Sequence, residues 1–156
     1  MKEKSKPAVI ATAFLAGWVA MIFCTSALLV LFAPILLPVY HTNVLINFLQ
    51  STWEVADEMG PLVKISLIIV FGILVFLFKG VLNSPAIWVY TKYISIAIIS
   101  MIIVLGLLPS DYSRGFGIGL TGMRFDKNVL HLYILGAMIG GALFARVLSK
   151  GFKANR

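Results

Sequence analysis

Few residues of this chain combine the types and the spacing that metal binding needs. Glu54, Asp57 and Glu58 follow one another at i, i+3 and i+4, so a helix would place all three on one face. His41 and His131 are the two histidines, and both lie near ends of apolar segments that we expect on the same side of a membrane. These five residues form a possible outer-face polar cluster. Because no HxxxH, ExxH or HExxH pairing accompanies them, we expect neither a metal nor another cofactor.

Catalytic arrangements are equally hard to assemble. Cys24 is the single cysteine, and its apolar surroundings include no histidine that could activate it at the same depth. Gly117-x-Gly119-x-x-Gly122 matches a dinucleotide fingerprint, but the strand and the βαβ unit that the fingerprint needs are missing from the pattern. We therefore expect no enzyme activity and no nucleotide. The loop around these glycines is compatible with a flexible connection or with a re-entrant element.

The composition indicates which solvent surrounds these residues. Hydrophobic residues make up 60% of the 156 positions and charged residues 12%, whereas soluble domains have about 45–50% and about 25%. The net charge of +7 comes from basic residues at the edges of apolar runs, not from one continuous patch. This distribution favours a lipid bilayer as the partner and argues against nucleic acid.

Four apolar segments are long enough to cross the roughly 30 Å hydrocarbon layer as helices. They span residues about 8–33, 62–81, 87–108 and 129–148. Between the first two, spaced apolar residues such as Val44 and Phe48 precede a late cluster of acidic residues, which predicts a short helix in the membrane interface with Trp53 at headgroup depth. The sequence thus predicts an all-α integral membrane protein in which residues 1–156 form a single transmembrane domain.

Small residues mark the last of these segments as a surface for close helix packing. Gly136 and Gly140 have GxxxG spacing, and a second small-xxx-small row runs beside them. The predicted packing residues are Gly136, Ala137, Gly140, Gly141 and Ala145. Another helix of the same chain or another subunit would fit equally well against this surface.

A small polar face on the third segment consists of Thr91, Lys92 and Ser95. Lys92 is deep enough to require snorkelling to the interface, and the group is a possible polar pathway or headgroup contact. The six acidic residues all lie outside the predicted spans, so ion-coupled transport lacks its usual carrier.

These features favour a non-catalytic membrane protein that binds another membrane protein or itself. Its role would be that of an accessory, structural or regulatory subunit of a membrane assembly. The alternative is a small homo-oligomeric channel or transporter for an ion or small solute.

Basic residues set the expected orientation, because Lys and Arg accumulate in cytoplasmic segments. Four spans place both termini on one side, together with nine of the 13 basic residues: Lys2, Lys4, Lys6, Lys79, Lys92, Arg146, Lys150, Lys153 and Arg156. The other side has four: Lys64, Arg114, Arg124 and Lys127. We therefore expect cytoplasmic termini, in the inner membrane of a prokaryote.

Reporter fusions test this orientation. A fluorescent protein that matures only in the cytoplasm should be bright when fused after Arg156, and a phosphatase that needs export should be inactive there. The same two reporters fused after Gly60 should give the reverse pattern. An active phosphatase at the C-terminus would contradict the predicted orientation.

Overall fold

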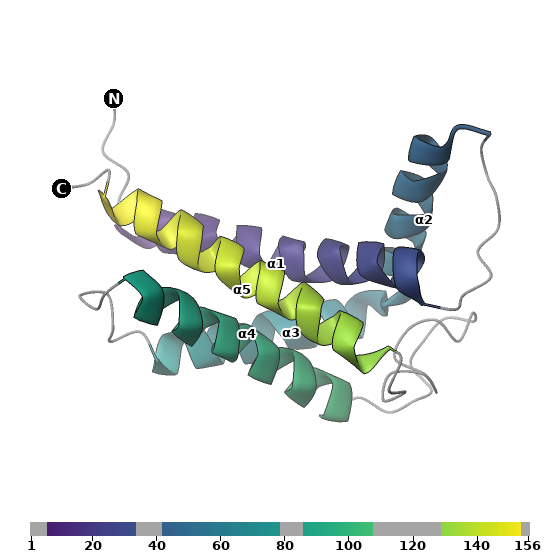
Figure 1. Cartoon of the computed structure of the whole chain (residues 1–156). Helices are drawn as coiled ribbons and strands as arrows, with labels where there is room; N and C mark the ends of the chain where they lie inside the picture. The colour runs from purple at the N-terminus through teal and green to yellow at the C-terminus, as the bar shows by residue number, and fades with distance from the viewer. Residues whose placement is uncertain (1–5, 34–41, 79–85, 108–128, 154–156) are drawn as a thin grey trace.

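In the described part of the chain, four long helices lie side by side and a shorter fifth helix projects from one flank (Figure 1). The computed structural model describes residues 6–33, 42–78, 86–107 and 129–153. Its helices are α1 (Lys6–Phe32), α2 (Val44–Glu58), α3 (Gly60–Leu77), α4 (Ala86–Leu107) and α5 (Leu130–Lys153). All except α2 contain an apolar stretch of at least 18 residues, long enough to span a membrane. Over the described residues, the predicted all-helical fold with four long apolar candidate membrane spans and a short helix between the first two is confirmed.

Two helix ends differ clearly from the predicted ones. The predicted second span continued to residue 81, but α3 ends at Leu77 because Phe78 leaves the helical region, at φ −101° and ψ 22°. The predicted fourth span ended at residue 148, yet α5 continues to Lys153. Its extra turn is supported from outside, because Gly151 lies directly against Val9 of α1.

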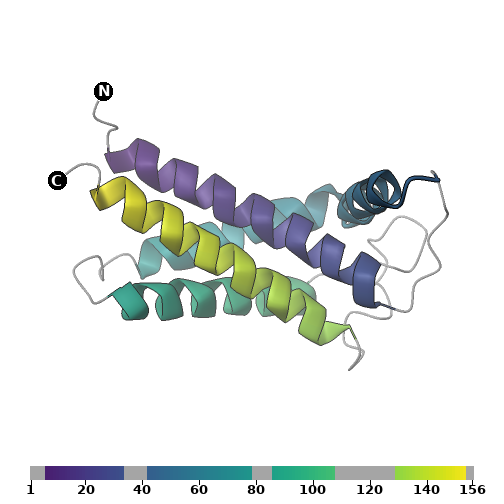
Figure 2. The same cartoon turned by 45° about the horizontal axis from the view of Figure 1, so that its top comes forward.

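Helix α5 runs antiparallel to α1 and packs closely against it along its whole length (Figure 2). A Cβ atom added to Gly140 would lie 2.7 Å from the Gly17 carbonyl oxygen and 2.9 Å from the Met21 backbone nitrogen. One turn away, Gly136 lies in the same way against the backbone of Thr25. Glycine is required here because any side chain would force the two backbones apart.

The neighbouring face of α5 packs against α4. A Cβ atom at Gly141 would lie 2.6 Å from the Tyr93 carbonyl oxygen and 2.9 Å from the Ala97 side chain. Phe144 fills the adjoining space, with its ring centroid 4.6 Å from that of Tyr93 and 5.5 Å from that of Phe71. Ala137 and Ala145 are fully buried beside these contacts. The small residues of α5 are therefore covered by α1 and α4 of the same chain.

The fourth side of the bundle, between α1 and α3, is joined more loosely. Phe14 of α1 stacks on Phe71 of α3 with a centroid separation of 5.3 Å, and Trp18 reaches Lys64 further along. Beyond that level α1 continues past the start of α3, and there Phe23 packs against Trp53 of α2. Helix α2 thus crosses the last third of α1 instead of running parallel to it (Figure 1).

Met59 is the single residue between α2 and α3, and the chain turns where α3 begins at Gly60. Gly60 has a φ of 70°, and the described residues contain no other residue at positive φ. Asn43 caps the far end of α2, where its side-chain oxygen accepts hydrogen bonds from the backbone N–H groups of Leu45 and Ile46 at 3.0 and 3.3 Å.

Matched glycine substitutions test the packing of α5. Gly140→Ala should destabilise the protein by about 1–3 kcal/mol, because the added Cβ would collide with backbone atoms of α1 that cannot rotate away. Gly106→Ala in α4 is the control, since a Cβ there meets nothing within 4 Å and alanine favours helix by about 1 kcal/mol. Thermal unfolding in detergent micelles should show a lower midpoint for the first variant only. Equal midpoints would contradict the close approach.

Candidate functional site

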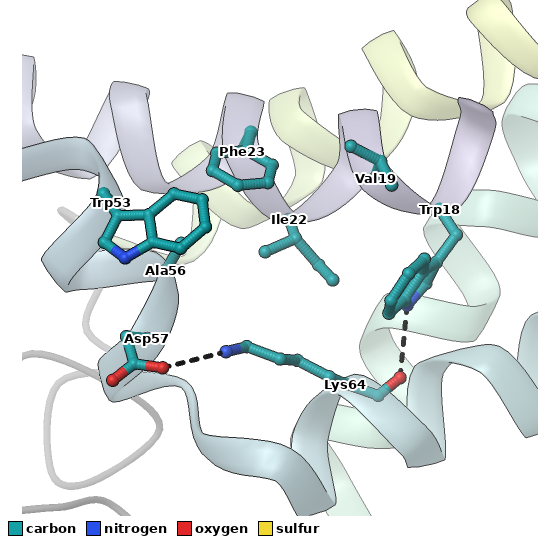
Figure 3. A pocket seen from close by; sticks show the side chains of 8 residues that line it. All are labelled: Trp18, Val19, Ile22, Phe23, Trp53, Ala56, Asp57 and Lys64. Carbon is teal, nitrogen blue, oxygen red and sulfur yellow. Dashed lines mark hydrogen bonds and ion pairs between the residues drawn. The ribbon is translucent and has the colours of Figure 1, made fainter. Parts of the chain in front are cut away.

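A pocket of about 180 Å³ lies where α1, α2 and the start of α3 converge (Figure 3). It occupies the loosely joined side of the bundle, beside the crossing of α1 and α2. Its lining is almost entirely apolar, with one pair of opposite charges. The lining residues are Trp18, Val19, Ile22, Phe23, Trp53, Ala56, Asp57 and Lys64.

One wall comes from two adjacent turns of α1 and is fixed by a hydrogen bond to α3. The Trp18 indole Nε1 donates to the backbone carbonyl oxygen of Lys64 at 3.2 Å. An indole N–H in an apolar environment needs an acceptor, and this carbonyl supplies it without a second polar side chain. Ile22, which is only 5% exposed, forms the centre of the wall.

The opposite wall comes from α2, whose two sides have different neighbours. Ser51, Thr52, Val55 and Ala56 face the bundle and are buried. Trp53 lies at the edge of the pocket, with its ring centroid 5.7 Å from that of Phe23, yet it is 65% exposed. The pocket is thus open toward the lateral surface of the bundle, where lipid would lie.

The Lys64 side chain extends along the floor of the pocket and ends at Asp57 (Figure 3). Its Nζ lies 3.5 Å from Asp57 Oδ1, and the two side chains are 27% and 74% exposed. Charge-assisted hydrogen bonds are shorter, about 2.7–2.9 Å. The ammonium and the carboxylate therefore face each other across the pocket mouth, with hydrogen-bonding capacity left on both.

The predicted outer-face cluster is only partly brought to this site. Asp57 lies at the pocket mouth, while Glu54 accepts a hydrogen bond from Gln50 Nε2 at 3.3 Å on the same helix. Glu58 is half-buried and His131 is exposed at the start of α5. His41 lies outside the described residues, as does the glycine loop of residues 115–122. Within the described ranges, no group of three or more His, Cys, Asp or Glu residues could hold a metal ion.

Of the three polar residues predicted on α4, Thr91 and Ser95 are exposed and Lys92 is half-buried. Thr91 and Ser95 are exposed on the outside of the bundle, and the Thr91 hydroxyl donates to the Ile87 carbonyl oxygen at 3.0 Å. The Lys92 Nζ is buried, has no hydrogen-bond partner among the residues that the structure describes, and lies 5.4 Å from the centroid of the Tyr93 ring. That distance allows a cation–π interaction.

Most of the pocket was not predicted from the sequence. Asp57 was assigned to the acidic cluster, and the α1 residues have the composition of an ordinary membrane span. One signal was present: Trp18 lies near the middle of its span, away from the interfaces where tryptophan usually accumulates. Its N–H must find an acceptor inside the membrane, and this requirement points to a contact with another helix.

Comparisons with known proteins do not assign this chain to a family. No protein-family model, no curated protein and no solved structure matches it at a significant level.

Replacing the indole tests the contact between α1 and α3. Trp18→Phe keeps an aromatic ring but removes the donor to the Lys64 carbonyl, so the free energy of unfolding should fall by about 0.5–1.5 kcal/mol. Trp88→Phe, at a position that is 65% exposed on α4, is the matched control. Unfolding in micelles, followed by circular dichroism, should separate the two variants. A Trp18→Phe protein as stable as the control would show that this hydrogen bond contributes nothing.

Proposed function

We propose that this protein is a non-catalytic integral membrane protein that acts by association, as an accessory, structural or regulatory subunit of a larger membrane assembly. The observation that carries the proposal is the position of α2. Its first half projects from the flank of the bundle (Figure 1), and Val44, Leu45 and Leu49 there are 84%, 65% and 58% exposed. This apolar surface extends beyond what the chain's own core uses.

The packing of α5 also favours α2 as the surface that binds a partner, because the small-residue face of α5 is already occupied within the bundle. The GxxxG face of α5 was predicted to pack against another helix of the same chain or against another subunit. Because α1 and α4 cover Gly136, Gly140 and Gly141, a second protein cannot approach these backbones without first separating the bundle. The projecting half of α2 is free of that restriction.

The orientation belongs to the same proposal. With cytoplasmic termini in a prokaryotic inner membrane, α2 lies in the outer interface, with Leu45 and Leu49 toward lipid or a partner. Its polar residues Gln50 and Glu54, which bond to each other, then face water. An amphipathic helix is stable in this position because its two faces match the two solvents.

The alternative is a homo-oligomeric channel or small-solute transporter. Thr91 and Ser95 face outward from a single bundle, so a pathway along them would form only between copies of the chain. Flux of an ion or small solute from liposomes that contain this protein alone would favour the alternative.

Crosslinking from α2 tests the proposed association. A photoreactive amino acid at Leu49 should give one discrete protein adduct in the native membrane, whereas the same amino acid at Ile99, 49% exposed on α4, should not. The adduct should be the protein that co-purifies in mild detergent. Leu45→Asn with Leu49→Asn should lower co-purification about tenfold or more, as loss of apolar anchors does at interfaces.

Three outcomes would count against the accessory role. A monomer without any co-purifying protein would contradict it directly. An adduct with a second copy of the same chain would favour the homo-oligomeric alternative. If the double variant is expressed normally and still co-purifies with the partner to the same extent, the interface does not lie on α2.

A further inference from the structure

Beyond the proposed association, we infer that the pocket between α1, α2 and α3 binds one zwitterionic aminophospholipid. Part of an acyl chain would lie against Trp18, Ile22 and Phe23. The phosphate would lie at Lys64 and the primary amine at Asp57. Three observations support this occupant: the depth of the pocket, the shape of its apolar part and the order of its charges.

The contacts of α1 place the pocket beside the apolar length of that helix. Trp18 and Phe23 line the pocket, and α1 continues in apolar residues from Ala27 to Phe32. The Lys64–Asp57 pair therefore lies on the lateral surface of the bundle, at or below the level of the headgroups. Charged groups at this depth are costly unless polar groups cover them. A lipid headgroup is the polar group that a bilayer supplies at this position.

The apolar part of the pocket fits a chain better than a ring system. Its volume of about 180 Å³ is below the roughly 300–1,000 Å³ of pockets that enclose whole drug-sized ligands. The walls are aromatic and aliphatic, and the side of Trp53 is open to the membrane. A pocket of this kind holds the first segment of an acyl chain while the rest remains among bulk lipid.

The charges follow the order of a phospholipid headgroup. Lys64 is the deeper of the two, 27% exposed and in contact with the apolar floor, and Asp57 lies further out at 74%. In an aminophospholipid the phosphate is next to the acyl chains and the amine is at the outer end. Lys64 Nζ and Asp57 Oδ1 are 3.5 Å apart, which leaves each of them able to bind a headgroup atom.

The same pair discriminates among headgroups. A primary ammonium can donate hydrogen bonds to the Asp57 carboxylate, and a phosphate oxygen can accept from Lys64 Nζ. The trimethylammonium of phosphatidylcholine has no N–H to donate. Phosphatidylglycerol has no cation, so the Asp57 carboxylate would have no headgroup partner once the phosphate binds Lys64. Phosphatidylethanolamine satisfies both charged side chains.

Quenching by brominated lipids tests this site directly. In a Trp53→Phe, Trp88→Phe background, Trp18 is the remaining tryptophan of three. In phosphatidylcholine nanodiscs with a small, equal fraction of brominated lipid, brominated phosphatidylethanolamine should quench Trp18 more strongly than brominated phosphatidylglycerol or phosphatidylcholine. The preference should be roughly threefold to tenfold in apparent affinity, the range of one partly screened charge-assisted hydrogen bond.

Variants of the charged pair separate recognition from folding. Lys64→Gln and Asp57→Asn should each abolish the preference, and Lys150→Gln on α5, at an exposed position, should retain it. The exchange Asp57→Lys with Lys64→Asp keeps an ion pair but reverses its order. This protein should unfold at the wild-type temperature and lack the preference, which a loss of folding could not explain.

Four results would overturn the inference. Equal quenching by the three lipids would mean that the pocket does not recognise headgroups. Absence of quenching above that of the bulk lipid would mean that no chain enters it. A preference that survives Lys64→Gln would exclude Lys64 as the phosphate contact. A preference retained in the exchanged pair would contradict the argument from charge order.

Discussion

The close approach of α5 to two neighbouring backbones is the constraint on which the rest of this structure depends. Lipid is as apolar as the side chains that face it, so burial of apolar surface gives membrane helices little reason to associate. Contact between backbones replaces that driving force, and it requires glycine at the contact points. Gly140 meets α1 and Gly141 meets α4, so two adjacent residues bind α5 to both neighbours.

Helix α3 has no comparable contact with α1, and the pocket is a result of that difference. The two helices meet through aromatic rings and through the bond from Trp18 to the Lys64 carbonyl, which are longer contacts than those at glycine. Where α1 continues past the start of α3, the space between them is partly filled by α2. The Phe23–Trp53 pair borders the open end of this space, and the bond from Trp18 to the Lys64 carbonyl borders the other end.

The helices could be predicted from the sequence, but the way in which they pack could not. Composition and segment length predict four spans, and the amphipathic pattern around Trp53 predicts α2, because each of these is a local property. GxxxG spacing identifies a packing face on α5 but carries no information about its partner. The pocket depends on the register between α1 and α3, which is set by distant contacts such as Phe14 with Phe71. The last turn of α5, beyond its predicted limit, likewise packs against a residue distant in the sequence, Val9.

The turn at Gly60 lies between the two charged residues of the pocket, Asp57 and Lys64. Its positive φ joins α2 to α3 through one residue, and the Lys64–Asp57 pair spans the same turn from one helix to the other. Asp57 lies three residues before Gly60 and Lys64 four residues after it, so the backbone conformation at this glycine sets the separation of the two charged groups. Because glycine adopts a positive φ far more readily than other residues, the width of the pocket mouth depends on a residue that is not part of the pocket lining.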